Sequence, residues 1–241
     1  MKQFFLSLAL VLAGGAALAQ TVEAPKYKQG ESWTYRVVNE KGPDRHEGHD
    51  EFIVSRVGAD TIVVDVRTAG SAVAKSEVMF GADWSKLRSV NGVETVVNRP
   101  FAFPLEVGKS WKVEFTELNP SRQKLRQTVS LPYKVVGWED VTVPAGTFKA
   151  LKIEADGRWS ADIAERNVGA SRKTGGRIYR CFWYVPEVRR WVKSIQEDFT
   201  AEGRRNNRAT SELERYGNSP KPVEKPTGAP AAPTIIDHDT L

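Results

Sequence analysis

Apolar residues alternate with polar ones along much of this chain, and this period of two limits the fold more than any other feature. Leu151 and Ile153 alternate with Lys152 and Glu154, and residues 62–66 form a β-branched run that only Asp65 interrupts. Successive side chains of a strand point to opposite faces, so this pattern predicts strands. Residues 160–167 are the one stretch whose pattern favours a short helix. We therefore predict a mainly β protein with a mostly antiparallel sheet and little helix.

Turn residues separate the predicted strands. Asn91-Gly92 favours a type I′ hairpin, because both residues tolerate a positive φ. Three further segments are predicted to be turns, namely Val136-Gly137-Trp138, Pro144-Ala145-Gly146 and Val185-Pro186-Glu187. Close turns between short strands are typical of antiparallel sheets.

A four-residue pattern occurs twice. Gly30-Glu31-Ser32-Trp33 is matched 78 positions later by Gly108-Lys109-Ser110-Trp111. The first copy precedes Phe52-x-Val54, and the second precedes Tyr133-x-Val135. Repetition of a motif and of the pattern that follows it indicates two structurally related β halves.

The two ends of the chain differ from its middle. Residues 1–19 combine Lys2, an apolar run and the small-residue site Ala17-Leu18-Ala19, which is typical of a secretory signal peptide. No other apolar stretch is long enough to span a membrane, so we expect an exported, soluble protein. Residues 217–241 are rich in proline and poor in large apolar residues, which predicts a disordered tail. A single β-rich domain is expected over residues 24–216.

Three further motifs stand out, namely Phe103-Pro104-Leu105 before Gly108-Lys109-Ser110-Trp111, Val141-Thr142-Val143-Pro144-Ala145-Gly146-Thr147-Phe148, and Trp183-Tyr184-Val185-Pro186-Glu187-Val188. Together they resemble the uncharacterised TapB-like domain-of-unknown-function group of exported β-rich proteins. The resemblance implies a periplasmic or secreted protein with a curved sheet, similar in outline to the LolA and LppX half-barrels. It implies no catalytic residue. The group usually carries glycine where this chain has Arg189-Arg190, so this turn is expected to form a basic tip.

The inventory of reactive side chains is small, so an enzyme is not favoured. No nucleophile elbow, phosphate-binding loop or dinucleotide-binding motif occurs. His46 and His49 lie close in sequence, but a strand would place them on opposite faces, and a solvated polar hairpin tip is favoured over a metal site. The single cysteine, Cys181, lies in an apolar run and is expected to be buried. We predict no catalytic residue, no metal and no cofactor.

Arginine and aromatic residues gather in the C-terminal third. Residues 158–208 contain twelve Lys or Arg against six Asp or Glu. One hypothesis is a carrier that binds a lipidic or hydrophobic ligand in a concave, aromatic-lined face, with arginines at the mouth for an acidic headgroup. Its candidate binding residues are Trp159, Trp183, Tyr184, Trp191, Arg180, Arg189 and Arg190. Core packing of the same rings is the alternative use of these side chains.

Two other classes of function stay open. The same fold could be an interaction module whose Arg-rich face contacts an anionic component of the cell envelope. A hydrolase is the least favoured class, and export disfavours nucleic acid as a partner. The sequence does not indicate an oligomeric state.

Overall fold

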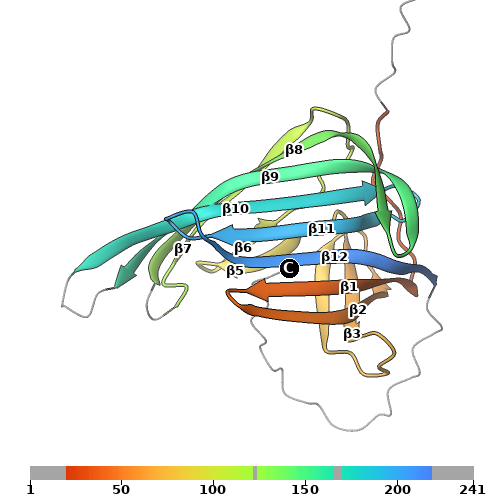
Figure 1. Ribbon diagram of the computed structural model, residues 1–241, viewed down its shortest axis with the longest axis horizontal. Coiled ribbons are helices and arrows are strands. Elements are labelled where there is room, and N and C mark those ends of the chain that lie inside the picture. Colours follow the sequence, from red (N-terminus) through yellow and green to blue (C-terminus); the bar gives the residue numbers. More distant parts are fainter. Residues whose placement is uncertain (1–19, 122–123, 165–169, 219–241) are drawn as a thin grey trace, which may run out of the picture.

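The computed structural model describes residues 20–121, 124–164 and 170–218, and in this part of the chain it contains strands and turns but no helix (Figure 1). The predicted signal peptide and residues 219–241 of the predicted tail lie outside the described residues. The strands are β1 (Glu31–Lys41), β2 (Asp44–Val57), β3 (Thr61–Thr68), β4 (Ser76–Gly81), β5 (Lys86–Val90), β6 (Val93–Asn98), β7 (Ser110–Leu118), β8 (Lys124–Val143), β9 (Gly146–Ala164), β10 (Ser171–Val185), β11 (Arg190–Phe199) and β12 (Arg205–Asn218).

Ten strands form one antiparallel sheet in the order β4-β3-β2-β1-β12-β11-β10-β9-β8-β7. The prediction of a mainly β, antiparallel protein is therefore confirmed. The first and last strands pair in the middle of this sheet, where Glu31 faces Asn218. Strand β12 thus includes the first two residues of the expected tail, Gly217 and Asn218. In the described residues no helix has the length and apolar character to cross a membrane.

The hairpin of β5 and β6 contacts both edges of the large sheet. It touches β4 at one edge and β7 at the other. A flat sheet of ten strands could not bring its edges so close, so the sheet is curled, and we call the face toward this hairpin the inner face. The hairpin turns at Asn91-Gly92 with φ values of 52° and 82°, as predicted.

The repeated motif has the same local structure in both copies. Gly30 and Gly108 have φ values of 90° and 91°, which glycine adopts readily. The amide of Gly30 donates to the carbonyl of Val54 at 2.8 Å, and that of Gly108 donates to the carbonyl of Val135 at 2.9 Å. Trp33 then pairs with Phe52 across β1 and β2, as Trp111 pairs with Tyr133 across β7 and β8. The repeat is therefore structural over this turn and the strand pair after it.

Two local predictions were wrong. Gly137 does not end a strand but lies at a bulge inside β8, where the register with β9 shifts. Residues 160–164 of the segment predicted to be helical continue β9, because residues 160–163 pair with both β8 and β10 and residue 164 pairs with β10. Residues 165–167 of that prediction lie outside the described residues. Pairing with two neighbouring strands satisfies the backbone and overrides a weak local helical pattern. The turn at Gly146, with a φ of 133°, agrees with the prediction.

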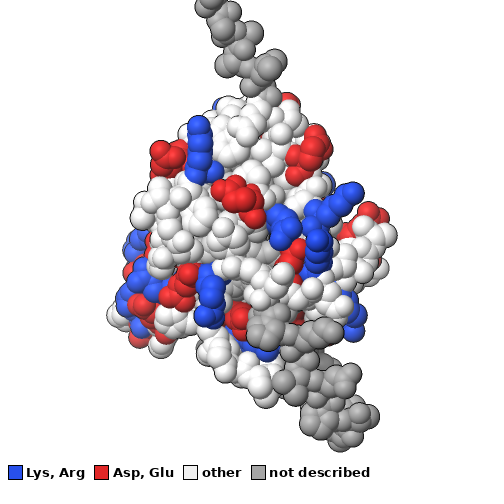
Figure 2. All heavy atoms as spheres, turned by 90° about the vertical axis from the view of Figure 1, so that its right-hand side faces the viewer, with Lys and Arg blue, Asp and Glu red and all other residues white. Residues whose placement is uncertain are grey.

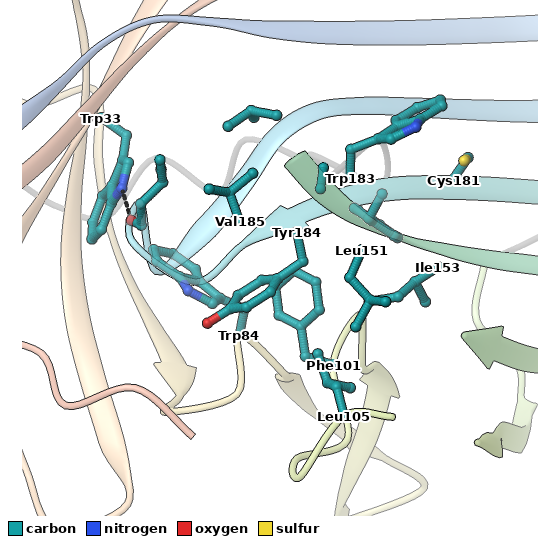
Figure 3. Packing of buried hydrophobic residues seen from close by; sticks show 14 of the residues in the cluster. Trp33, Trp84, Phe101, Leu105, Leu151, Ile153, Cys181, Trp183, Tyr184 and Val185 are labelled. Atoms are coloured by element: carbon teal, nitrogen blue, oxygen red, sulfur yellow. Dashed lines mark hydrogen bonds between the residues drawn. The ribbon is translucent and has the colours of Figure 1, made fainter. Parts of the chain in front are cut away.

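Strand β10 carries buried side chains on both faces of the sheet. Figure 3 shows Tyr184 directed toward Phe101 on the inner side, whereas Cys181 and Trp183 project from the other side. All four side chains are at most 8% exposed. The inner face carries the larger set of aromatic contacts, since Tyr184, Phe182 and Trp191 all pack around Phe101.

Candidate ligand-binding groove

A groove of about 150 Å³ lies on the inner face of the sheet, across β1 to β4, β11 and β12. One part of its wall is apolar and comes from Tyr35, Val37, Phe52, Val66, Val78, Phe80, Ala209 and Trp191. The remainder is polar and comes from Asn39, Asp50, Lys75, Ser76, Lys86, Ser194, Gln196, Thr210 and Ser211. The groove therefore offers both an apolar surface and hydrogen-bonding groups.

Strand periodicity brings the apolar side chains of this wall together. Tyr35 and Val37 lie two residues apart on β1, and they face Leu213 and Ser211 on β12. The Tyr35 ring meets the Phe52 ring edge to face with centroids 5.8 Å apart. The Tyr35 hydroxyl donates to the carbonyl of Trp191 at 2.7 Å, which ties β1 to β11. The wall is thus built from side chains that pack against one another and that one hydrogen bond links across the sheet.

Short polar contacts link several of the polar lining residues of the groove. The hydroxyls of Ser194 and Ser211 lie 2.6 Å apart on β11 and β12. At the rim, the ammonium of Lys75 donates to the carboxylate of Asp50 at 2.7 Å. This rim charge is therefore balanced within the protein.

Arg190 lies immediately behind the apolar wall and is 1% exposed. Its guanidinium carbon is 3.9 Å from the Phe52 ring centroid, 4.0 Å from that of Trp84 and 4.1 Å from that of Trp191. Tyr35 and Trp33 complete the cage at 5.0 and 5.5 Å. Burial lowers the pKa of Arg190 to about 10, so the side chain is still charged at neutral pH. Cation–π contacts stabilise such a charge.

The turn that carries Arg189 and Arg190 packs against the start of β1. The Trp33 indole donates to the carbonyl of Val188 at 2.9 Å, and the Tyr27 hydroxyl donates to that of Arg189 at 2.9 Å. The Arg189 guanidinium lies 3.2 Å from the carboxylate of Glu31. The turn that was expected to form a basic tip therefore packs against β1. Arg190 is enclosed by aromatic rings, and Arg189 forms an ion pair with Glu31.

The structure brings together only part of the predicted binding set. Trp191 lines the groove and Arg190 adjoins it. Tyr184 packs in the inner core against Phe101, with ring centroids 4.7 Å apart. Arg180 forms an ion pair with Asp198 at 2.9 Å.

The other two predicted aromatic residues lie elsewhere. Trp183 is on the opposite face of β10, where its indole donates to the carboxylate of Glu139. Trp159 lies under the ammonium of Lys124, 5.7 Å away, and lines a hollow of about 630 Å³. That hollow is larger than the groove, but Trp159 is the one large apolar side chain among its described lining residues. We regard the groove as the stronger candidate because eight apolar side chains line it, and small-molecule sites usually combine apolar side chains with a few polar groups.

Sequence reasoning missed most of the wall and cage. Tyr35, Phe52 and Trp84 come from the first half of the chain, far from the arginine-rich segment that drew attention to Arg190. The repeated motif was the one available signal, since it marked Trp33 and the strand pair that contains Phe52.

Cys181 is fully buried, and burial raises the pKa of its thiol to about 12. His49 Nδ1 lies 2.9 Å from the carboxylate of Glu214 on the surface. In the part of the chain that the structure describes, His, Cys, Asp and Glu form no cluster of three that could hold a metal.

Many arginines of the basic segment are paired with carboxylates. Arg177 contacts Asp156 at 2.7 Å, and Arg205 and Arg208 both lie close to Glu197 and Glu40. Figure 2 shows acidic and basic side chains interspersed on one face of the molecule. These pairs weaken the electrostatic case for an arginine-rich docking face, because each one offsets a positive charge locally.

Comparisons with known proteins give similarity of structure at low identity. No family model matches the chain, and no curated protein matches it. A crystal structure of a presumed lipoprotein from Parabacteroides distasonis has a TM-score of 0.45 at 12% identity, over 82% of this chain and all of the other. A presumed exported protein with a YmcC-like fold from Bacteroides fragilis has a TM-score of 0.41 at 15% identity, over 83% of this chain and all of the other.

The hypothetical lipoprotein YmcC from Escherichia coli has a TM-score of 0.34 at 10% identity, over 76% of this chain and 84% of the other. At TM-scores of 0.45 or lower, the three likenesses establish neither a shared function nor a shared ligand. The resemblance to the TapB-like group stays a sequence-based interpretation.

Proposed function

We propose that this chain is an exported binding protein without catalytic activity, and that it holds the apolar part of a ligand in the inner-face groove. The observation that carries the proposal is the groove itself, because its apolar side chains line an open space and are not fully packed against other core residues. Export, with the periplasm as destination, is proposed from the leader expected at residues 1–19 and from the sequence resemblance.

The size of the groove limits its ligand. Sites for drug-sized molecules usually have volumes of about 300–1,000 Å³. A volume of about 150 Å³ matches the engineered protein cavity that takes one benzene molecule. We therefore propose that the groove holds one ring or a short segment of an acyl chain, with the remainder of the ligand outside.

The first experiment is native mass spectrometry of the protein isolated from a cell that exports it. A reproducible adduct that is lost on denaturation is expected, and its mass identifies the ligand class. Protein that carries no adduct and binds none of a panel of short-chain lipids and aromatic compounds would refute the proposal.

Two substitutions on β4 locate the ligand. Val78 lines the groove, so Val78→Trp is expected to fill it and remove the adduct. Met79 is the next residue and is 56% exposed, so Met79→Trp adds the same side chain outside the groove and should leave the adduct in place. Equal loss of the adduct in both variants would argue against the groove as the site.

A further inference from the structure

Buried hydrogen-bond donors without acceptors gather next to the groove, at Trp191 of its wall and at the adjoining Arg190. Nε and Nη1 of Arg190 and Nε1 of Trp191 are all enclosed, and within the described residues none of these atoms has a hydrogen-bond partner. They belong to consecutive residues at the start of β11. All three are donors, so a group that satisfies them must supply acceptor oxygens.

The charge of Arg190 is also unpaired. Within the described part of the chain no carboxylate forms an ion pair with it, although Arg189 and Arg180 each have one. Its neighbours are five aromatic rings, which stabilise a cation but accept no strong hydrogen bond. A buried charge of this kind is stabilised best by an oppositely charged, hydrogen-bonded partner.

The cage and the groove share part of their structure. Tyr35, Phe52 and Trp191 line the groove, and the same three rings surround the guanidinium of Arg190. These rings therefore stand between the guanidinium of Arg190 and the groove. A ligand that enters the apolar groove comes within a ring's thickness of an unpaired positive charge and of the Trp191 indole N–H.

We propose that the ligand of this groove is an amphipathic anion, and that its carboxylate or phosphate group pairs with Arg190 and accepts a hydrogen bond from Trp191. This inference rests on the proposed function, because it assigns the acid group of the molecule whose apolar part the groove holds. Since the donors are enclosed, the acid group reaches them when a wall ring turns aside. Carboxylate and phosphate both match the donor fork of arginine.

The test uses three probes with the same chain, namely octanoate, octyl phosphate and octan-1-ol. Each is titrated into the full chain, expressed with its own N-terminal segment, and binding is followed by calorimetry and by tryptophan fluorescence. At least one of the two anions is expected to bind 10-fold or more tightly than octan-1-ol. The tighter anion tells whether the acid group is a carboxylate or a phosphate.

Variants assign the anion preference to Arg190. Arg190→Met is expected to weaken binding of the preferred anion at least 10-fold and to leave octan-1-ol within twofold. Arg189→Met is the matched control, because Arg189 is adjacent in sequence but faces Glu31, and it should leave all three affinities within about twofold. Circular dichroism checks that both variants fold. The comparison of anion and alcohol affinities for the unaltered protein requires neither variant.

The outcomes separate this inference from the proposed function. Equal affinities for octan-1-ol and both anions would overturn the inference and leave the groove as an apolar site. An anion preference that persists in folded Arg190→Met would also overturn it, since the anion would then use another cation. Failure of all three probes to bind would overturn the proposed function, and the inference with it.

Discussion

The indole Nε1 of Trp33 donates a hydrogen bond to the carbonyl oxygen of Val188, 2.9 Å away and 155 residues later in the chain. This bond fastens the turn between β10 and β11 to the first strand, and the same turn leads directly into Arg190. The position of the caged guanidinium therefore depends on a contact between the two ends of the fold.

Replacement of Trp33 by Phe keeps an aromatic ring but removes this buried donor. The carbonyl of Val188 is then left without its partner, and we expect the free energy of unfolding to fall by about 1–3 kcal/mol. Trp111→Phe is the control from the second copy of the motif, because its indole bonds to Arg99 in an exposed setting. Denaturant unfolding that gave equal losses for both variants would contradict this account.

Gly157 is predicted to tolerate no side chain. A Cβ there would lie against the carbonyl oxygen of Ser130 and 2.8 Å from Cα of Leu131, both backbone atoms of β8. Gly157→Ala should therefore force β8 and β9 apart and reduce stability by about 2 kcal/mol or more. Gly48→Ala on β2 is the matched control, because no atom lies within 4 Å of its Cβ position and the change should be neutral or slightly stabilising. Thermal melts of the two variants test this difference in stability.

Cys181 should resist thiol reagents in the folded protein. With a pKa of about 12, roughly one thiol in 10,000 is ionised at pH 8, and the side chain is fully buried. Labelling with a maleimide at pH 8 is expected to proceed only as fast as the protein unfolds, and to become rapid in denaturant. Rapid labelling under native conditions would show that the apolar run around Cys181 opens locally.

Arg190 should limit the stability of the ligand-free protein. Methionine has a similar length and no donors, so Arg190→Met removes the unsatisfied N–H groups without leaving a large cavity, and we expect stability to rise by about 1 kcal/mol or more. Arg190→Ala removes the same charge but leaves a cavity among the rings and should be destabilising. A loss of stability in Arg190→Met would indicate that the five cation–π contacts outweigh the cost of the unpaired donors.

Local patterns in the sequence predicted the strands, because alternation and turn residues act over a few positions. They predicted the Asn91-Gly92 hairpin and the strand through Leu151 and Ile153. They failed at Gly137, since a bulge and a turn both use glycine, and only the pairing with β9 distinguishes them.

The groove was harder to predict than the strands. Its position depends on which distant strands become neighbours, and no local pattern indicates that β1 pairs with β12. The sequence identified Trp191 and Arg190 as candidates, but it placed the arginines at the mouth of a concave face. Four of the five rings that enclose Arg190 come from β1, β2 and the segment before β5, more than 100 residues away in the chain.

The pairing of β1 with β12 also determines when the groove can exist. Protein synthesis and export proceed from the N-terminus, and Ala209 and Ser211 of the last strand form part of the groove wall. Without β12 no strand would join β1 to β11, and the groove wall would lack Ala209 and Ser211. The groove is completed only when the final strand arrives, so a nascent or truncated chain that lacks β12 cannot retain a ligand there.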